Sequence, residues 1–245
     1  MNKKRISIIG LPRSGTTILA NVLNSLDDTV CLSEPLWTFF KFGRLRNIGK
    51  VDFSEHSKEL SDFLPSIYET FKESEYTNLC VKETYTDWHQ ESVETIDETF
   101  PTDYTIFIIR DPKTTYSSWK NIKWTYGAPV FASGRFAKIK YFIDSFVVFN
   151  SYMDSKLKSN ENALVLEYEK LASEDGLAYL KEKLSGIVDI PLDLELKNIK
   201  NGIGDPKARI STHIEKYRVE HDNLTSEESA RCEQLSNDYS NYYRQ

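Results

Sequence analysis

The chain has 245 residues, of which 40% are hydrophobic and 13% aromatic, and its formal net charge is −6 at pH 7. This length can bury a sizeable core, and no stretch resembles a linker, so we expect one domain over residues 1–245. The acidic balance argues against nucleic acid as a partner, and no stretch approaches the roughly 20 apolar residues of a membrane span. The first apolar run is too short for a signal-peptide core, so we expect a cytoplasmic protein.

The predicted elements alternate between strands and helices. A strand over 5–10, a helix over 15–26 and a short strand near 30–32 precede a long aromatic and polar region that ends at about residue 77. The elements expected after it are a strand over 79–82, a helix over 86–100, a strand over 104–109, helices over 112–122 and 134–157, a strand over 163–167 and helices over 173–185 and 226–243. This alternation predicts an α/β fold with a central parallel sheet flanked by helices.

The segment GLPRSGTTIL at 10–19 joins the first strand to the first helix. Backbone N–H groups in such a loop converge on an anion, and the positive end of the helix dipole attracts the same charge. The spacing of Gly10, Gly15, Thr16 and Thr17 matches G-x-x-x-x-G-K-[ST], except that Thr16 replaces the lysine, and Arg13 adds a cation. The segment therefore predicts a phosphate loop without the nucleotidase lysine.

A second candidate anion contact follows the strand over 104–109. Arg110 stands at the carboxyl end of this strand, where open α/β sheets place their ligands. A guanidinium makes paired, charge-assisted bonds to phosphate that a lysine does not reproduce. A local ion pair with Asp111 is the structural alternative.

Together these segments resemble the sulfotransferases that use 3'-phosphoadenosine 5'-phosphosulfate (PAPS). In that family a loop similar to PRSGTT holds the 5'-phosphosulfate, and a strand-end arginine with a serine eight positions later holds the 3'-phosphate, which is the spacing of Arg110 and Ser118. LEYEKL at 166–171 resembles the YEDL segment of the family, and GIGDP at 202–206 resembles its C-terminal nucleotide loop. The resemblance covers most of the chain and implies a single-domain P-loop sulfotransferase fold and a PAPS-dependent enzyme of the EC 2.8.2 type.

The resemblance also implies the donor contacts. Tyr168 would contact adenine, although a strand-end aromatic is often part of the core, and Thr16 and Thr17 can cap the helix as well as bind phosphate. The implied donor-binding residues are Pro12, Arg13, Ser14, Gly15, Thr16, Thr17, Arg110, Ser118, Tyr168, Lys200, Asn201, Gly202 and Gly204.

Transfer to a hydroxyl needs a base, and Glu34 is our candidate. Similar sulfotransferases of the tyrosylprotein and carbohydrate branches carry a glutamate in this segment, and in the tyrosylprotein branch it is the proposed base. Glu83 is the alternative, because the cytosolic small-molecule branch places its histidine base after the corresponding strand, where this chain has no histidine and His89 is six residues away. The structural alternative for Glu34 is an ion pair with a nearby lysine or a turn cap.

Lys82 completes the predicted catalytic set. LCVK at 79–82 resembles the LC-x-K segment that supplies a catalytic lysine in the tyrosylprotein branch. Lys82 would stabilise the bridging oxygen between phosphate and sulfonate, and Arg13 would share this role. An ordinary strand-end lysine is the alternative.

The sequence thus predicts sulfonate transfer from PAPS to a hydroxyl, or an amine, of a small neutral or cationic acceptor by in-line displacement, with no metal. Aromatic residues such as Trp37, Trp119 and Trp124 are candidates for the acceptor wall, and most of them are expected in the core. Three cysteines without metal-ligand spacing predict neither a disulfide framework nor a zinc site. A Mg²⁺-dependent P-loop kinase and a noncatalytic nucleotide-binding protein remain the alternatives.

Overall fold

The computed structural model describes residues 3–36, 39, 50–53, 55–86, 90–121, 138–159, 162–197 and 223–243. A five-stranded sheet has the order β2-β3-β1-β4-β5, and all its neighbouring strands are parallel. The strands are β1 (Lys4–Gly10), β2 (Thr29–Ser33), β3 (Asn78–Thr84), β4 (Tyr104–Ile109) and β5 (Ala163–Glu167). The predicted α/β class with a central parallel sheet is confirmed.

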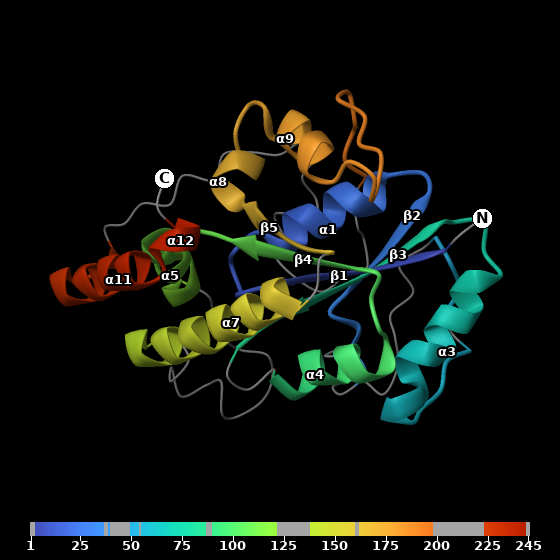
Figure 1. The fold of residues 1–245 in the computed structure, drawn as a ribbon, viewed down its shortest axis with the longest axis horizontal. Coiled ribbons are helices and arrows are strands. Elements are labelled where there is room, and N and C mark those ends of the chain that lie inside the picture. Colours follow the sequence, from blue (N-terminus) through green and yellow to red (C-terminus); the bar gives the residue numbers. More distant parts are fainter. Residues whose placement is uncertain are drawn as a thin grey trace.

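Helices cover both faces of the sheet (Figure 1). Helices α1, α8 and α9 lie over one face and α3, α4 and α7 over the other, while α5, α11 and α12 gather near the end to which β4 points. Their bounds are α1 (Thr16–Ser25), α3 (Leu60–Lys72), α4 (Gln90–Thr99), α5 (Pro112–Lys120), α7 (Ile139–Ser159), α8 (Tyr168–Leu171), α9 (Gly176–Lys183), α11 (Ser226–Asp238) and α12 (Ser240–Tyr243).

Alternate side chains of each strand point to opposite sides of the sheet, and helices cover both sides, so the strands are buried on both faces. In β1, Ile6 and Ile8 pack in the cluster that contains α1, whereas Ile9 packs in the cluster that contains α5 and α7. Full burial of each such side chain contributes about 1.5–3 kcal/mol relative to an exposed one. The apolar strand runs read from the sequence therefore fix the middle layer of the fold.

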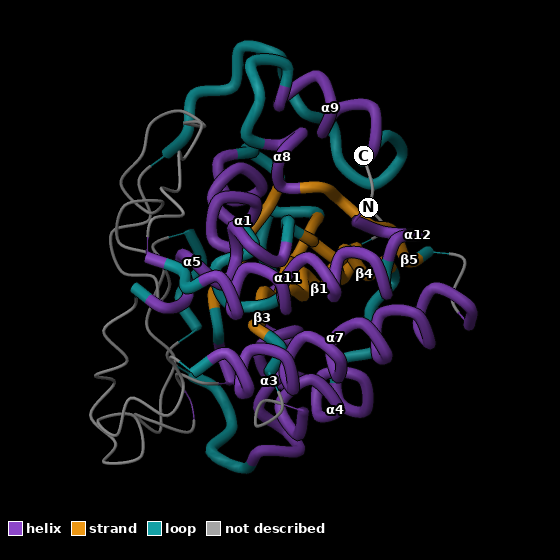
Figure 2. The backbone as a smooth tube through the Cα atoms, turned by 90° about the vertical axis from the view of Figure 1, so that its left-hand side faces the viewer, coloured by secondary structure: helices purple, strands orange, loops and turns teal. Residues whose placement is uncertain are grey.

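The strand order sets the place of the site. The chain leaves β1 toward β2 on one side of the sheet and leaves β4 toward β5 on the other side. In open α/β sheets, ligands bind in the crevice at the carboxyl ends of the strands where the order reverses. Here that position lies between the ends of β1 and β4. Figure 2 shows the molecule from this side, with α5 and α11 in front of the strands.

Several predicted boundaries were wrong. Residue 86, expected to start the helix over 86–100, is non-helical, and α4 covers Gln90–Thr99. The helix expected over 134–157 runs from Ile139 to Ser159 among the described residues. The helix expected over 173–185 is shorter, at Gly176–Lys183, and the one expected over 226–243 is interrupted at Tyr239. Helix α8 was not predicted, because its four residues are too few to show a periodicity.

Helix α3 was also missed, inside the region taken as irregular. Phe63, Leu64, Ile67 and Phe71 line its buried side at helical spacing. Pro65 disguises the pattern: it is the sixth residue of the helix, beyond the first four N–H groups that need no partner, so the helix forgoes one intrahelical hydrogen bond there. Thr225 and Glu228 form a capping box at the start of α11.

The described structure bears on two further expectations, for the cysteines and for a membrane span. Cys31, Cys80 and Cys232 are buried free thiols, as expected from their spacing. No helix in the described ranges combines the length and the apolar character needed to cross a bilayer.

Candidate active site

The phosphate loop connects β1 to α1 through residues 11–15. Gly15 is the N-cap of α1 and has a φ of 102°, a conformation that L side chains rarely adopt. A Cβ atom at Gly15 would lie 2.4 Å from Cδ2 of Tyr168, so the loop packs tightly on that ring. No side chain caps the helix at this position, so the capping alternative for Thr16 and Thr17 does not describe this N-terminus.

Ser14 provides a test of whether the loop fits a phosphate. Its side chain is only 2% exposed, and its Oγ has no hydrogen-bond partner within the described part of the chain. A buried hydroxyl without a partner is costly, and a phosphate oxygen would satisfy it. The first N–H groups of α1, which begins two residues later, favour the same anion.

Arg13 links the loop to α5. Its φ of 75° lies in the left-handed region, which costs a non-glycine residue roughly 1–3 kcal/mol. Its Nε donates to the Oγ of Ser118 at 2.9 Å. The structure therefore brings together the predicted 5'-phosphate loop and one of the two residues predicted to bind the 3'-phosphate.

Arg110 lies directly after β4 and is buried. Its Nη1 donates to the backbone carbonyl of Arg13 at 2.9 Å, and its Cζ stands 4.3 Å from the centroid of the Tyr168 ring. Burial lowers the pKa of Arg110, and the nearby Tyr168 and Glu169 oppose this shift. The guanidinium nevertheless keeps its charge because its ordinary pKa is so high.

Asp111, the alternative partner of Arg110, has a structural role of its own. Its carboxylate accepts from the N–H of Thr114 at 2.8 Å and from the hydroxyl of Thr114 at 2.7 Å, so it caps α5. A capping carboxylate also stabilises the positive end of the helix dipole. The cap fixes where α5 starts and hence where Ser118 lies.

Glu34 and Lys82 meet where β2 ends beside β3. Ser33 is the register partner of Lys82, so Glu34 is the next residue along. Its N–H donates to the carbonyl of Lys82 at 2.6 Å, and its carboxylate accepts from the Nζ of Lys82. Glu34 also has a positive φ of 52°, which ends the strand. The side chains are 1% exposed for Lys82 and 14% for Glu34.

This ion pair corresponds to the structural alternative for Glu34, but its partner is the predicted catalytic lysine. The contact therefore joins two residues that were assigned separately to the reaction. Because Lys82 is almost fully buried, its charge needs the carboxylate to offset the loss of water.

Glu83, the alternative base, faces the other side of β3, since consecutive strand residues alternate. It is buried, and its Oε1 accepts from the backbone N–H of Leu36 at 2.9 Å. That contact holds the chain just after Glu34, so Glu83 supports the segment on which the candidate base stands.

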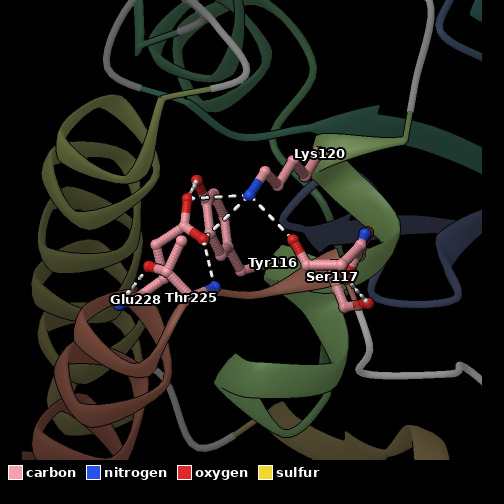
Figure 3. A network of polar contacts seen from close by, with 6 residues as sticks. Tyr116, Ser117, Lys120, Thr225 and Glu228 are labelled. Atoms are coloured by element: carbon pink, nitrogen blue, oxygen red, sulfur yellow. Dashed lines mark hydrogen bonds and ion pairs between the residues drawn. The ribbon is translucent and has the colours of Figure 1, made fainter.

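Helix α5 is tied to the start of α11 by a polar network (Figure 3). The carboxylate of Glu228 accepts from Lys120 Nζ at 2.8 Å and from the hydroxyl of Tyr116 at 2.9 Å. Ser117 Oγ donates to Oδ1 of Asn223 at 2.7 Å, and Nδ2 of Asn223 donates to the carbonyl of Ser117 at 3.0 Å. The residue before Ser118 is therefore held on both its side chain and its backbone. The sequence analysis missed these partners of Glu228, because no local pattern links α5 to α11.

Some predicted residues cannot be placed. Lys200, Asn201, Gly202 and Gly204 lie outside the described residues, as do Trp37 and Trp124. Trp119 is fully buried against Tyr141 and Phe142, so it belongs to the core and not to an acceptor wall. Within the described ranges, no group of three or more His, Cys, Asp or Glu side chains is arranged to hold a metal ion.

Comparisons with known proteins agree with this fold. A family model described as "Sulfotransferase family" matches residues 5–176. The sulfotransferase domain from the Synechococcus PCC 7002 olefin synthase superposes with a TM-score of 0.59 at 15% identity, covering 98% of this chain and 95% of that chain. Mouse sulfotransferase SULT7A1 complexed with PAP gives a TM-score of 0.54 at 16% identity, covering 97% and 85% of the two chains. At such identities the likeness concerns the fold alone, which is that of the P-loop sulfotransferases. A search of curated protein sequences gave no significant match.

Proposed function

The chain belongs to the sulfotransferase family, whose model matches residues 5–176, and we propose that it transfers the sulfonate group of PAPS to a hydroxyl group of a small molecule. The observation that carries this proposal is the contact between Arg13, Arg110 and Ser118, because it joins a phosphate loop to a second cationic site. PAPS carries phosphate groups at both its 5' and 3' positions. Two linked anion sites at one edge of the sheet suit such a donor.

In the proposed donor site, the loop N–H groups and Ser14 bind the 5'-phosphosulfate. Arg110 and Ser118 bind the 3'-phosphate, and their link through Arg13 fixes the spacing of the two sites. The proximity of the helix α1 N-terminus adds its dipole to the 5' site. The solved relative complexed with PAP, the donor product 3'-phosphoadenosine 5'-phosphate, is consistent with such a site in this fold.

The proposed reaction uses Glu34 and Lys82. The acceptor oxygen attacks sulfur in line as its proton moves to the Glu34 carboxylate, and the bond between sulfur and the bridging oxygen breaks. Its electrons remain on the 5'-phosphate of the departing PAP, where Lys82 and Arg13 offset the developing charge. The proposed reaction requires no metal, because these cations supply the positive field that Mg²⁺ supplies in kinases.

The proposed acceptor is a small neutral or cationic molecule, since the net charge of −6 disfavours a polyanion. The same proposal places the protein in the cytoplasm and treats residues 1–245 as one sulfotransferase domain. The fold alone does not select the acceptor.

Two measurements test the proposal. Calorimetric titration should give much tighter binding of PAP than of adenosine 5'-phosphate (AMP), which lacks the 3'-phosphate. Arg110→Ala should remove most of that difference, at about 1.5–3 kcal/mol per lost charged bond. Incubation with PAPS labelled in its sulfonate and a panel of hydroxyl-bearing and amine-bearing small molecules should then give a labelled product. Equal affinity for PAP and AMP in the unmodified protein would reject the donor site.

A further inference from the structure

We propose that Tyr168 is a positioning residue for the 3'-phosphate, which it serves by orienting Arg110. The inference rests on the proposed function, because it deepens the use of the same donor site. It assigns Tyr168 a different role from the adenine contact that the resemblance implies, and the two roles predict different nucleotide selectivities.

The sheet register places the two residues side by side. Ile109, the last residue of β4, pairs with Glu167, the last residue of β5, and Arg110 and Tyr168 directly follow them. The guanidinium carbon of Arg110 lies 4.3 Å from the ring centroid of Tyr168. An arginine over an aromatic face at this distance is a cation–π contact, which strengthens when both groups are removed from water. Both side chains are buried here.

The contact fixes an otherwise adaptable side chain. Arg110 has several rotatable bonds, and an unconstrained guanidinium loses much of its freedom when it binds a phosphate. The ring of Tyr168 supports its plane, and the hydrogen bond from Nη1 to the carbonyl of Arg13 sets its direction. Arg110 is thus oriented before the nucleotide arrives, and such preorganisation increases affinity without a new contact to the ligand.

The same ring also lies against the phosphate loop. A Cβ atom at Gly15 would stand 2.4 Å from Cδ2 of Tyr168, so the phosphate loop packs directly on it. One side chain therefore contacts both the loop and the arginine. We infer that Tyr168 sets the separation of the two anion sites, which a mononucleotide without a 3'-phosphate does not sense.

Selectivity between PAP and AMP tests the inference. Both nucleotides carry adenine and a 5'-phosphate, so loss of an adenine contact weakens both alike. In calorimetric titrations of the full chain, we expect Tyr168→Leu to weaken PAP binding by roughly 3- to 30-fold, the range of a cation–π contact, and AMP binding by less than about 2-fold. Tyr168→Phe, which keeps the ring, should retain the selectivity of the unmodified protein.

Two further comparisons separate an effect on Arg110 from a general folding defect. A pentafluorophenyl ring introduced at position 168 keeps the shape of the phenylalanine variant but removes electron density from its face, so it should lower PAP affinity relative to Tyr168→Phe and leave AMP affinity unchanged. In an Arg110→Gln background, Tyr168→Leu should cause no further loss of PAP affinity, because a residue that acts through Arg110 has no effect without it.

The outcomes separate the inference from the proposed function. If the unmodified protein does not prefer PAP to AMP, the donor assignment itself fails. If it prefers PAP but Tyr168→Leu weakens both nucleotides equally, or weakens PAP equally with and without Arg110, then Tyr168 contacts adenine and the inference is overturned.

Discussion

The network at the start of α11 allows a quantitative prediction for Glu228→Gln. Glu228 lies at the junction of α5 and α11, where its carboxylate accepts from Lys120, from Tyr116 and from the N–H of Thr225 (Figure 3). Glutamine has nearly the same shape but no charge, and its amide presents a donor where the carboxylate accepted. The substitution therefore weakens the tie that holds the Ser118 helix without creating a cavity.

The pKa of Glu228 indicates how much folding free energy the Glu228→Gln substitution should remove. Burial raises this pKa, but the hydrogen bonds from Lys120, the Thr225 N–H and Tyr116 outweigh burial and lower it from 4.5 to about 2. A pKa lowered from 4.5 to about 2 corresponds to roughly 3–4 kcal/mol of folding free energy before solvent screening is considered. The Lys120 side chain is 30% exposed, so solvent screening reduces the expected loss in Glu228→Gln to about 1–2 kcal/mol at pH 7.

The contribution of Glu228 to folding stability should decrease as the pH falls. The pKa of Glu228 is lower in the folded protein, so its contribution to stability is complete above pH 4.5 and is lost as the pH falls toward 2. Urea unfolding at a series of pH values should therefore show a gap between the unmodified protein and Glu228→Gln at pH 7 that closes over this window.

Glu227→Gln is the matched control. It removes the same charge from the same helix turn, but the ion pair of Glu227 with Arg231 is on the surface, where the glutamate side chain is 73% exposed. Exposed pairs of this kind contribute about 0–1 kcal/mol. Equal losses in the two variants, or a gap that persists at pH 2, would refute the reasoning.

Three further predictions concern catalysis and donor binding. Glu34→Gln should lower turnover roughly 100- to 10,000-fold with little change in PAP affinity, whereas Glu83→Gln should do far less; steady-state kinetics in which the Glu83 variant is the inactive one would move the base to Glu83. Lys82→Ala should lose turnover with a modest loss of donor binding, and the unmodified enzyme should stay active in excess chelator; activity abolished by chelator and restored by Mg²⁺ would favour a kinase. Ser14→Ala should weaken PAP roughly 10- to 100-fold without lowering the unfolding temperature of the unliganded protein, because the buried hydroxyl has no hydrogen-bond partner among the described residues. Unchanged PAP affinity in Ser14→Ala would contradict that contact.

The strand ends could be predicted from sequence because they are local features. An apolar run followed by a polar residue marks the carboxyl end of a buried strand, which is why Arg110 could be placed directly after β4, whereas β3 continues two residues past Lys82, to Thr84. The phosphate loop was recognisable for the same reason, since its spacing and its flanking strand and helix lie within one short segment.

Contacts between distant segments could not be predicted in this way. Lys120 and Glu228 are 108 residues apart, and neither has a local pattern that indicates the other. The contact of Arg110 with Tyr168 depends on the register of β4 with β5, which the sequence does not specify residue by residue. The pair of Glu34 and Lys82 was foreseen only as a general alternative, because its formation depends on β2 lying next to β3.

The backbone of the site is strained where the proposed chemistry occurs. Arg13 and Glu34 both have positive φ values, of 75° and 52°, and such strain persists only where surrounding contacts impose it. For Glu34 those contacts are the ladder to Lys82 and the support of the following segment by Glu83. For Arg13 they are the bonds to Ser118 and from Arg110. In each case the residue that imposes the strain is itself a proposed site residue or holds one in place, so relaxing either conformation would displace its partner as well. The proposed base and the donor clamp are therefore each held in place at the edge of the sheet.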